Sequence, residues 1–112
     1  MNQEEYQNNI IAIANHYDYE SQSRQLIEEM AELTVAINKL WRAERFCDRK
    51  NIIDVKGFSY PETKGIIGEI ADVEIMLSQI KYLLDCQDEV EQEKERKILR
   101  QLERMKEELE GE

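Results

Sequence analysis

The sequence predicts an all-α fold, a four-helix-type bundle in a single domain that spans residues 1–112. Two observations support this prediction. Apolar residues recur three and four positions apart in several long segments, which is the spacing of one face of an α-helix. The composition is 36% charged and rich in Glu, Lys, Leu and Ile, with only one proline and four glycines, and such a mixture favours long helices.

The first two helices are expected on either side of a break near residue 18. The first covers about residues 3–16, and Ile10, Ile11 and Ala14 face inward. Asp18 or Ser21 can cap the second helix, and Ser21 is favoured because it directly precedes a long periodic run. The second helix has an apolar seam of Leu26, Met30, Leu33, Ile37 and Leu40, with a further strip of Ile27, Ala31 and Val35. A helix that is apolar on two sides favours burial in an oligomer, although a compact four-helix monomer is also compatible.

Two more helices are expected after a loop. Residues 49–60 predict the loop, since Gly57 breaks the periodicity and Pro61 suits the start of a helix. The third helix covers about residues 62–86, and its seam is Ile66, Ile70, Val73, Leu77, Ile80 and Leu84. The fourth covers about residues 88–110 and is highly charged, with one apolar stripe of Ile98, Leu102, Met105 and Leu109. This stripe predicts an exposed amphipathic helix.

The composition excludes several classes of function. A net charge of −10 argues against binding nucleic acid through a broad basic surface. No apolar run reaches the length of about 18 residues needed to span a membrane, and the start of the chain has no signal-peptide pattern. Cys47 and Cys86 lie far apart without a Cys/His cluster, which indicates free thiols and argues against zinc. We therefore expect a cytoplasmic protein with no membrane partner.

Two pairs of carboxylates flank the seams of the second and third helices. Glu29 and Glu32 are three residues apart, as are Glu69 and Asp72, so each pair can point to one place. Each carboxylate directly precedes a seam residue. If the helices pack antiparallel, the register that pairs residue 29 with 72 also pairs 32 with 69, and the four carboxylates converge.

Four converging carboxylates repel one another unless protons or cations compensate the charge. Oxygen ligands without His or Cys suit Mg²⁺ or Mn²⁺, and Mg²⁺ commonly meets its substrate through phosphate oxygens. A di-iron site normally needs Glu-x-x-His motifs, and the only histidine, His16, is not spaced from these residues. For either pair alone, a solvated helix surface is the commoner explanation.

The segments IEEMAELTVAINKLWR and GEIADVEIMLSQI resemble the MazG-like nucleotide pyrophosphohydrolases, a family similar to the dimeric all-α dUTPases. The hallmark EExxE occurs here as residues 28–32, and ExxD as residues 69–72. The resemblance covers about residues 20–86. It implies a helical dimer or tetramer and Mg²⁺-dependent hydrolysis of nucleoside triphosphates to monophosphate and pyrophosphate, a nucleotide-pool house-cleaning activity. It also implies Glu29, Glu32, Glu69 and Asp72 as metal ligands and Glu28 as an outer ligand or a catalytic residue that orients water.

Three further side chains are candidates for binding the substrate. Lys39 lies on the same helical face as Glu32, and Lys64 falls at the same end of the antiparallel pair. Both can hold the outer phosphates, or they can be ordinary surface lysines. Gln25, on the other side of the carboxylates, can bind a base or a ribose, or belong to the helix surface.

Two non-catalytic functions compete with the hydrolase. The apolar seams also suit a helical protein-interaction module, which has no use for converging carboxylates. A member of the family that binds nucleotide without cutting it ranks lower, because all four implied metal ligands are present.

Overall fold

The computed structural model describes residues 1–46 and 61–111, and all of its regular structure is helical. The three helices are α1 (Gln3–Phe46), α2 (Pro61–Leu83) and α3 (Gln87–Glu110). The described ranges contain no β-strand, so the all-α prediction is confirmed. The expected loop at residues 49–60 lies outside the described residues.

Helix α1 consists of two arms that meet at a kink. The backbone of Asp18 has φ 73° and ψ 173°, which a helix cannot contain. Oδ1 of Asp18 accepts a hydrogen bond from the backbone N–H of Ser21 at 3.1 Å, and this is an N-cap of the second arm. Of the two candidate caps, Asp18 is therefore the one that the structure uses, because its carboxylate reaches the amide three residues later.

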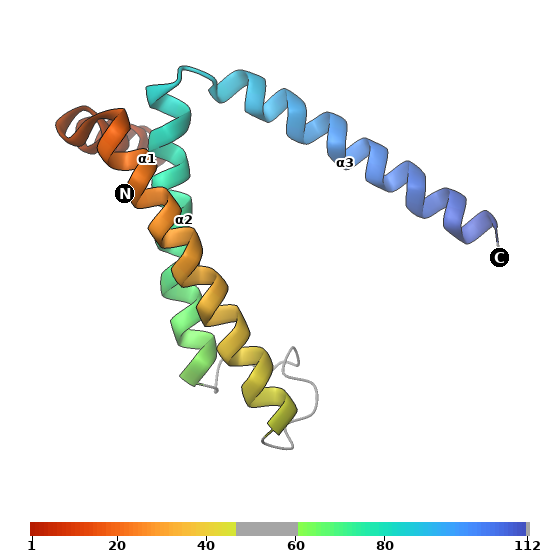
Figure 1. The fold of residues 1–112 in the computed structure, drawn as a ribbon. Helices are drawn as coiled ribbons and strands as arrows, with labels where there is room; N and C mark the ends of the chain where they lie inside the picture. Colours follow the sequence, from red (N-terminus) through yellow and green to blue (C-terminus); the bar gives the residue numbers. More distant parts are fainter. Residues whose placement is uncertain (47–60, 112) are drawn as a thin grey trace.

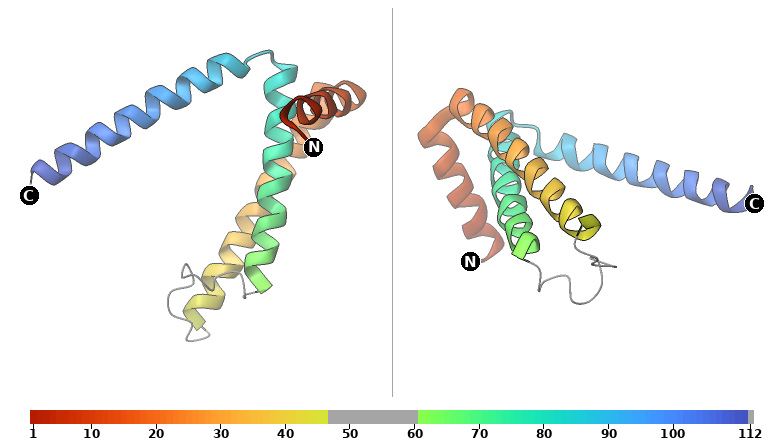
Figure 2. Two further views of the ribbon diagram at one scale, coloured as in Figure 1. Left: turned by 180° about the vertical axis from the view of Figure 1, so that it is seen from behind. Right: turned by 60° about the horizontal axis from the view of Figure 1, so that its bottom comes forward.

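Helix α2 lies between the two arms of α1 (Figure 2). The hydroxyls of Tyr6 and Ser78 are 2.8 Å apart, and the hydroxyl of Tyr82 donates to Oδ1 of Asn15 at 3.2 Å. These contacts attach the first arm to the C-terminal half of α2. The buried apolar core of the described residues is small and consists of Ile10 and Ala14 on the first arm and Val73 and Met76 on α2.

The expected seams are only partly buried. On α2, Val73 is buried, but Ile70, Leu77 and Leu84 are 41%, 41% and 53% exposed. On α1, Met30 and Ile37 are 43% and 50% exposed, whereas the other seam residues are half-buried. These five seam residues are therefore not covered by the described parts of this chain, and the expected burial in an oligomer stays a prediction. The reason is that α2 contacts two arms at once, which places Met76 and Gln79 in the contact surface instead.

Helix α3 extends away from the other two helices (Figure 1). A hydrogen-bonded corner separates it from α2: Asp85, at φ 52°, donates to the carbonyl of Tyr82, and Cys86 donates to that of Lys81. This is a Schellman-type helix end. No residue of α3 is buried, so α3 does not complete a bundle with the described parts of α1 and α2. The prediction of an exposed amphipathic helix is confirmed.

Candidate metal centre

A buried glutamine pair fixes how α2 lies along the second arm of α1. Nε2 of Gln22 donates to Oε1 of Gln79 at 2.7 Å, and both side chains are buried. Gln22 stands seven residues before Glu29, and Gln79 seven residues after Asp72. The hydrogen bond therefore marks the antiparallel register that the sequence predicts, with residue 32 opposite residue 69.

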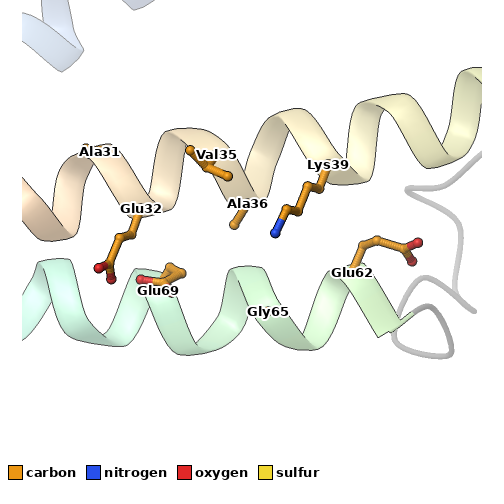
Figure 3. A pocket seen from close by; sticks show the side chains of 8 residues that line it. All are labelled: Ala31, Glu32, Val35, Ala36, Lys39, Glu62, Gly65 and Glu69. Carbon is orange, nitrogen blue, oxygen red and sulfur yellow. The ribbon is translucent and has the colours of Figure 1, made fainter.

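Three carboxylates come together where α1 and α2 lie side by side. Glu29, Glu32 and Glu69 each place an oxygen so that these atoms all lie within 4.8 Å of one another. Figure 3 shows Glu32 on α1 and Glu69 on α2 reaching toward the space between the helices. Glu29 and Glu69 are half-buried, while Glu32 is exposed. Three acidic side chains at this spacing are candidate oxygen ligands, from two helices, for one hard cation.

Two oxygens of this cluster are buried without a hydrogen bond. Nε2 of Gln25 donates to Oε1 of Glu29 at 2.8 Å, which fixes that carboxylate. Oε2 of Glu29 and Oε2 of Glu69 are both inaccessible to solvent and accept no hydrogen bond from the described residues. A buried carboxylate oxygen without a donor is costly, so these two oxygens are candidates to accept a proton from a neighbouring carboxyl or to bind a cation.

The cluster raises the pKa of its exposed member, Glu32. The charge of Glu29, followed by that of Glu69, raises the pKa of the Glu32 carboxyl above its usual value, and loss of water around it adds to the shift. Like charges at this distance favour a bound proton or a bound cation. A raised pKa of Glu32 is what the sequence analysis expects of converging carboxylates, which repel one another unless protons or cations compensate the charge.

The remaining predicted carboxylates lie outside this group. Asp72 is exposed and is not among the oxygens that converge, and Glu28 is exposed as well. The structure thus brings together three of the four residues implied as ligands. Glu32 and Glu69 lie opposite each other in the antiparallel register.

A groove of about 570 Å³ continues from the carboxylates toward the start of α2. Apolar and charged residues line it in equal number: Ala31, Glu32, Val35, Ala36, Lys39, Glu62, Gly65 and Glu69. The size is within the usual range for a small-molecule site. Figure 3 shows Lys39 pointing from α1 toward α2, between Glu69 and Glu62. An ammonium group that lines the same groove as the carboxylates can bind a phosphate that the carboxylates alone would repel.

The other predicted substrate contacts are placed differently. Lys64 is exposed and does not line the groove. Gln25 donates to Glu29, so in this structure it orients a carboxylate. Sequence reasoning missed Glu62 and Gly65. The signal for Glu62 was present, because it precedes Glu69 by seven residues and so lies on the same helical face.

Comparisons of the chain with models of protein families, with curated proteins and with solved structures found no match. The likeness to the MazG-like family therefore stays a prediction from the two short motifs. None of the described helices combines the length and the apolar character needed to cross a lipid bilayer.

Proposed function

We propose that the protein is a cytoplasmic, Mg²⁺-dependent MazG-like hydrolase that converts nucleoside triphosphates to nucleoside monophosphate and pyrophosphate. One observation carries the proposal: carboxylates from two helices converge at one end of a groove, with buried oxygens of Glu29 and Glu69 that accept no hydrogen bond from the described residues. A substrate with a charged phosphate chain and a less polar base matches a groove that combines charged side chains along its length with apolar ones such as Val35 and Ala36.

Each side chain has a distinct role in this proposal. Glu29, Glu32 and Glu69 would hold Mg²⁺, or Mn²⁺ in its place, and Asp72 stays a fourth candidate ligand from the ExxD motif. The bound cation supplies charge neutralisation at the phosphates and acidifies coordinated water. Gln25 holds the Glu29 carboxylate in place through its hydrogen bond. Lys39 would bind the outer phosphates, with Lys64 as a second candidate at the same end.

The reaction balances with water as the only co-substrate. The oxygen of water forms a bond to the α-phosphorus, and the bond between that phosphorus and the α–β bridging oxygen breaks. The bridging oxygen and its electron pair leave with pyrophosphate. A carboxylate that is not fully used as a ligand takes the proton of the attacking water, and Glu28 is the candidate from the EExxE motif.

The test is pyrophosphate release from a panel of NTPs and dNTPs, in Mg²⁺ and in EDTA. We expect release in Mg²⁺ only, with the monophosphate as co-product. Glu69→Gln should lower kcat by at least about 100-fold, in the range of lost charge stabilisation in a transition state. Glu74→Gln is the matched control, since Glu74 is an exposed glutamate of the same helix outside the cluster. Equal activity of the two variants would contradict the proposal.

The second candidate is a non-catalytic helical interaction module. The exposed apolar residues of α3, from Ile98 at 57% to Leu109 at 73%, favour it. Such a module does not depend on the carboxylates, so Glu69→Gln would leave its binding unchanged. A folded protein that neither binds Mg²⁺ nor releases pyrophosphate from any nucleotide would favour this candidate.

We also propose that the protein works as a homodimer or tetramer, in which helices of several copies complete the predicted four-helix bundle. The support is the amount of apolar surface that one chain leaves exposed.

A further inference from the structure

Gly65 occupies a helix position that does not need a glycine. It lies inside α2, where a glycine lowers helix stability relative to alanine because its backbone loses more freedom on folding. None of the described glycines has a positive φ, so the backbone conformation does not select glycine at residue 65. A Cβ atom at this position would meet nothing within 4 Å outside its own turn of helix, so close packing does not select glycine either.

The residue that faces Gly65 on α1 is also small. Ala36 stands fourteen residues after Gln22, and Gly65 stands fourteen residues before Gln79, so the register of the buried glutamine pair sets Ala36 opposite Gly65. Both residues line the groove, and Figure 3 shows Ala36 across from Gly65. A side chain at residue 65 would therefore narrow the groove, because the space beside the glycine is otherwise open.

This part of the groove suits a nucleobase. The side chain of Val35 lines the groove and is 50% exposed, although it is apolar. A nucleobase has flat faces of low polarity, which can cover Val35 and Ala36 and lie against the bare backbone at Gly65. These three residues offer no side-chain donor to a phosphate, so the charged part of the substrate fits better beside the charged residues of the lining.

The phosphates of the same substrate have partners of their own. Glu32 and Glu69, the candidate ligands of a cation, line the groove on one side of Gly65. The Lys39 side chain leans from its backbone toward these carboxylates (Figure 3), as helix side chains lean toward the N-terminus. Its ammonium can therefore bind the outer phosphates while the base lies on Gly65.

We propose that Gly65 determines the specificity of the groove, because the space beside it holds the nucleobase of the substrate against Val35 and Ala36. The inference rests on the proposed hydrolase function, since it assigns a place to one part of the same substrate. A side chain at residue 65 competes with the base for this space and leaves the carboxylates and Lys39 unchanged. Binding of the base should weaken as that side chain becomes larger.

Two pairs of variants test the role of this position. Gly65→Ala and Gly65→Leu fill the space in two steps, and Gly68→Ala and Gly68→Leu are the matched controls. Gly68 is another exposed glycine of α2 that leaves open space for a Cβ atom, but it does not line the groove. Alanine and leucine favour helices more than glycine does, so we expect each variant to keep its helix content and its Tm, or to gain up to about 4 °C.

Two probes separate the base from the phosphates. One is a nucleoside triphosphate with a methylene bridge between the α and β phosphorus, which cannot be hydrolysed at that bond. The other is inorganic tripolyphosphate, which has the phosphate chain without base or sugar. In calorimetric titrations with Mg²⁺, Gly65→Leu should raise the Kd of the nucleotide analogue at least about tenfold, with a smaller rise for Gly65→Ala. The Kd of tripolyphosphate should change less than about twofold, as should both Kd values in the Gly68 variants.

Two results would overturn the inference. If Gly65→Leu weakens both probes equally, the phosphate chain and not the base lies beside Gly65. If Gly65→Leu and Gly68→Leu have equal effects on the nucleotide analogue, the space beside Gly65 has no role in binding.

The inference and the proposed hydrolase fail separately in this design. A wild type that releases pyrophosphate, together with an unchanged Kd in Gly65→Leu, would contradict only the base site. A wild type that shows the expected difference at Gly65 but releases no pyrophosphate would support the base site and contradict the hydrolase. A folded wild type that binds neither probe would contradict both.

Discussion

Replacing Gln22 by leucine removes the amide that donates to Oε1 of Gln79. That oxygen belongs to a side chain with 1% exposure, so water cannot replace the lost donor. A buried polar atom left without its partner costs about 1–3 kcal/mol. For a domain of 112 residues, in which 1 kcal/mol shifts Tm by about 4 °C, Gln22→Leu should lower Tm by about 4–12 °C.

The double variant Gln22→Leu/Gln79→Leu separates this reasoning from a simple effect of packing. With both amides gone, no buried polar atom of the pair is left unsatisfied, and two leucines of similar size occupy the contact. We therefore expect the double variant to be at least about 1 kcal/mol more stable than Gln22→Leu alone.

The assay is thermal and urea unfolding of the wild type, the two single variants and the double variant. All samples are held at one protein concentration, because association changes the apparent stability. If the double variant loses as much stability as the two single variants combined, the argument from an unsatisfied buried oxygen is refuted. The pair would then contribute through its shape, and not through its hydrogen bond.

Three further variants test the site and the kink. Glu32→Gln should stabilise the metal-free protein at neutral pH. The charges of Glu29 and Glu69 raise the pKa of Glu32, so the ionised Glu32 carboxylate is repelled in the folded protein once the pH rises through its folded-state pKa. The gain in stability of the variant should therefore vanish below pH 4.5, the ordinary pKa of a glutamate, where Glu32 is protonated in the folded and the unfolded protein. Melting curves in EDTA over this pH range check it, and a constant gain at acid pH would contradict the role of charge. Asp18→Ala should cost about 1 kcal/mol through the lost N-cap, while Asp18→Asn, which can keep the cap and tolerates positive φ, should unfold close to the wild type. Lys39→Ala should raise KM for a nucleoside triphosphate roughly tenfold. Lys39→Arg keeps the positive charge and should have a KM close to that of the wild type. An unchanged KM in Lys39→Ala would show that Lys39 does not make the proposed phosphate contact.

The sequence by itself determined where the helices lie and which carboxylates share a face within one helix. Helical periodicity is local, so the starts of α2 and α3 were predicted within one residue and the end of α3 at residue 110. The spacing of Glu29 and Glu32 places both on one helical face whatever the helix packs against. The register that sets Glu32 opposite Glu69 was predicted for the case of antiparallel helices, from pairing residue 29 with 72, and the hydrogen bond between Gln22 and Gln79 has this register.

Only the tertiary structure decided which faces are buried and which carboxylates meet. Apolar spacing alone does not separate a residue that packs in its own chain from one that stays exposed, and Ile70 and Val73 differ only because α2 is held between two arms of α1. Asp72 has the same spacing from Glu69 as Glu32 has from Glu29, yet only Glu32 joins the cluster, because the angle at which two helices face each other is set by all their contacts together. The choice of Asp18 as cap likewise depended on a backbone turn that no local pattern encodes.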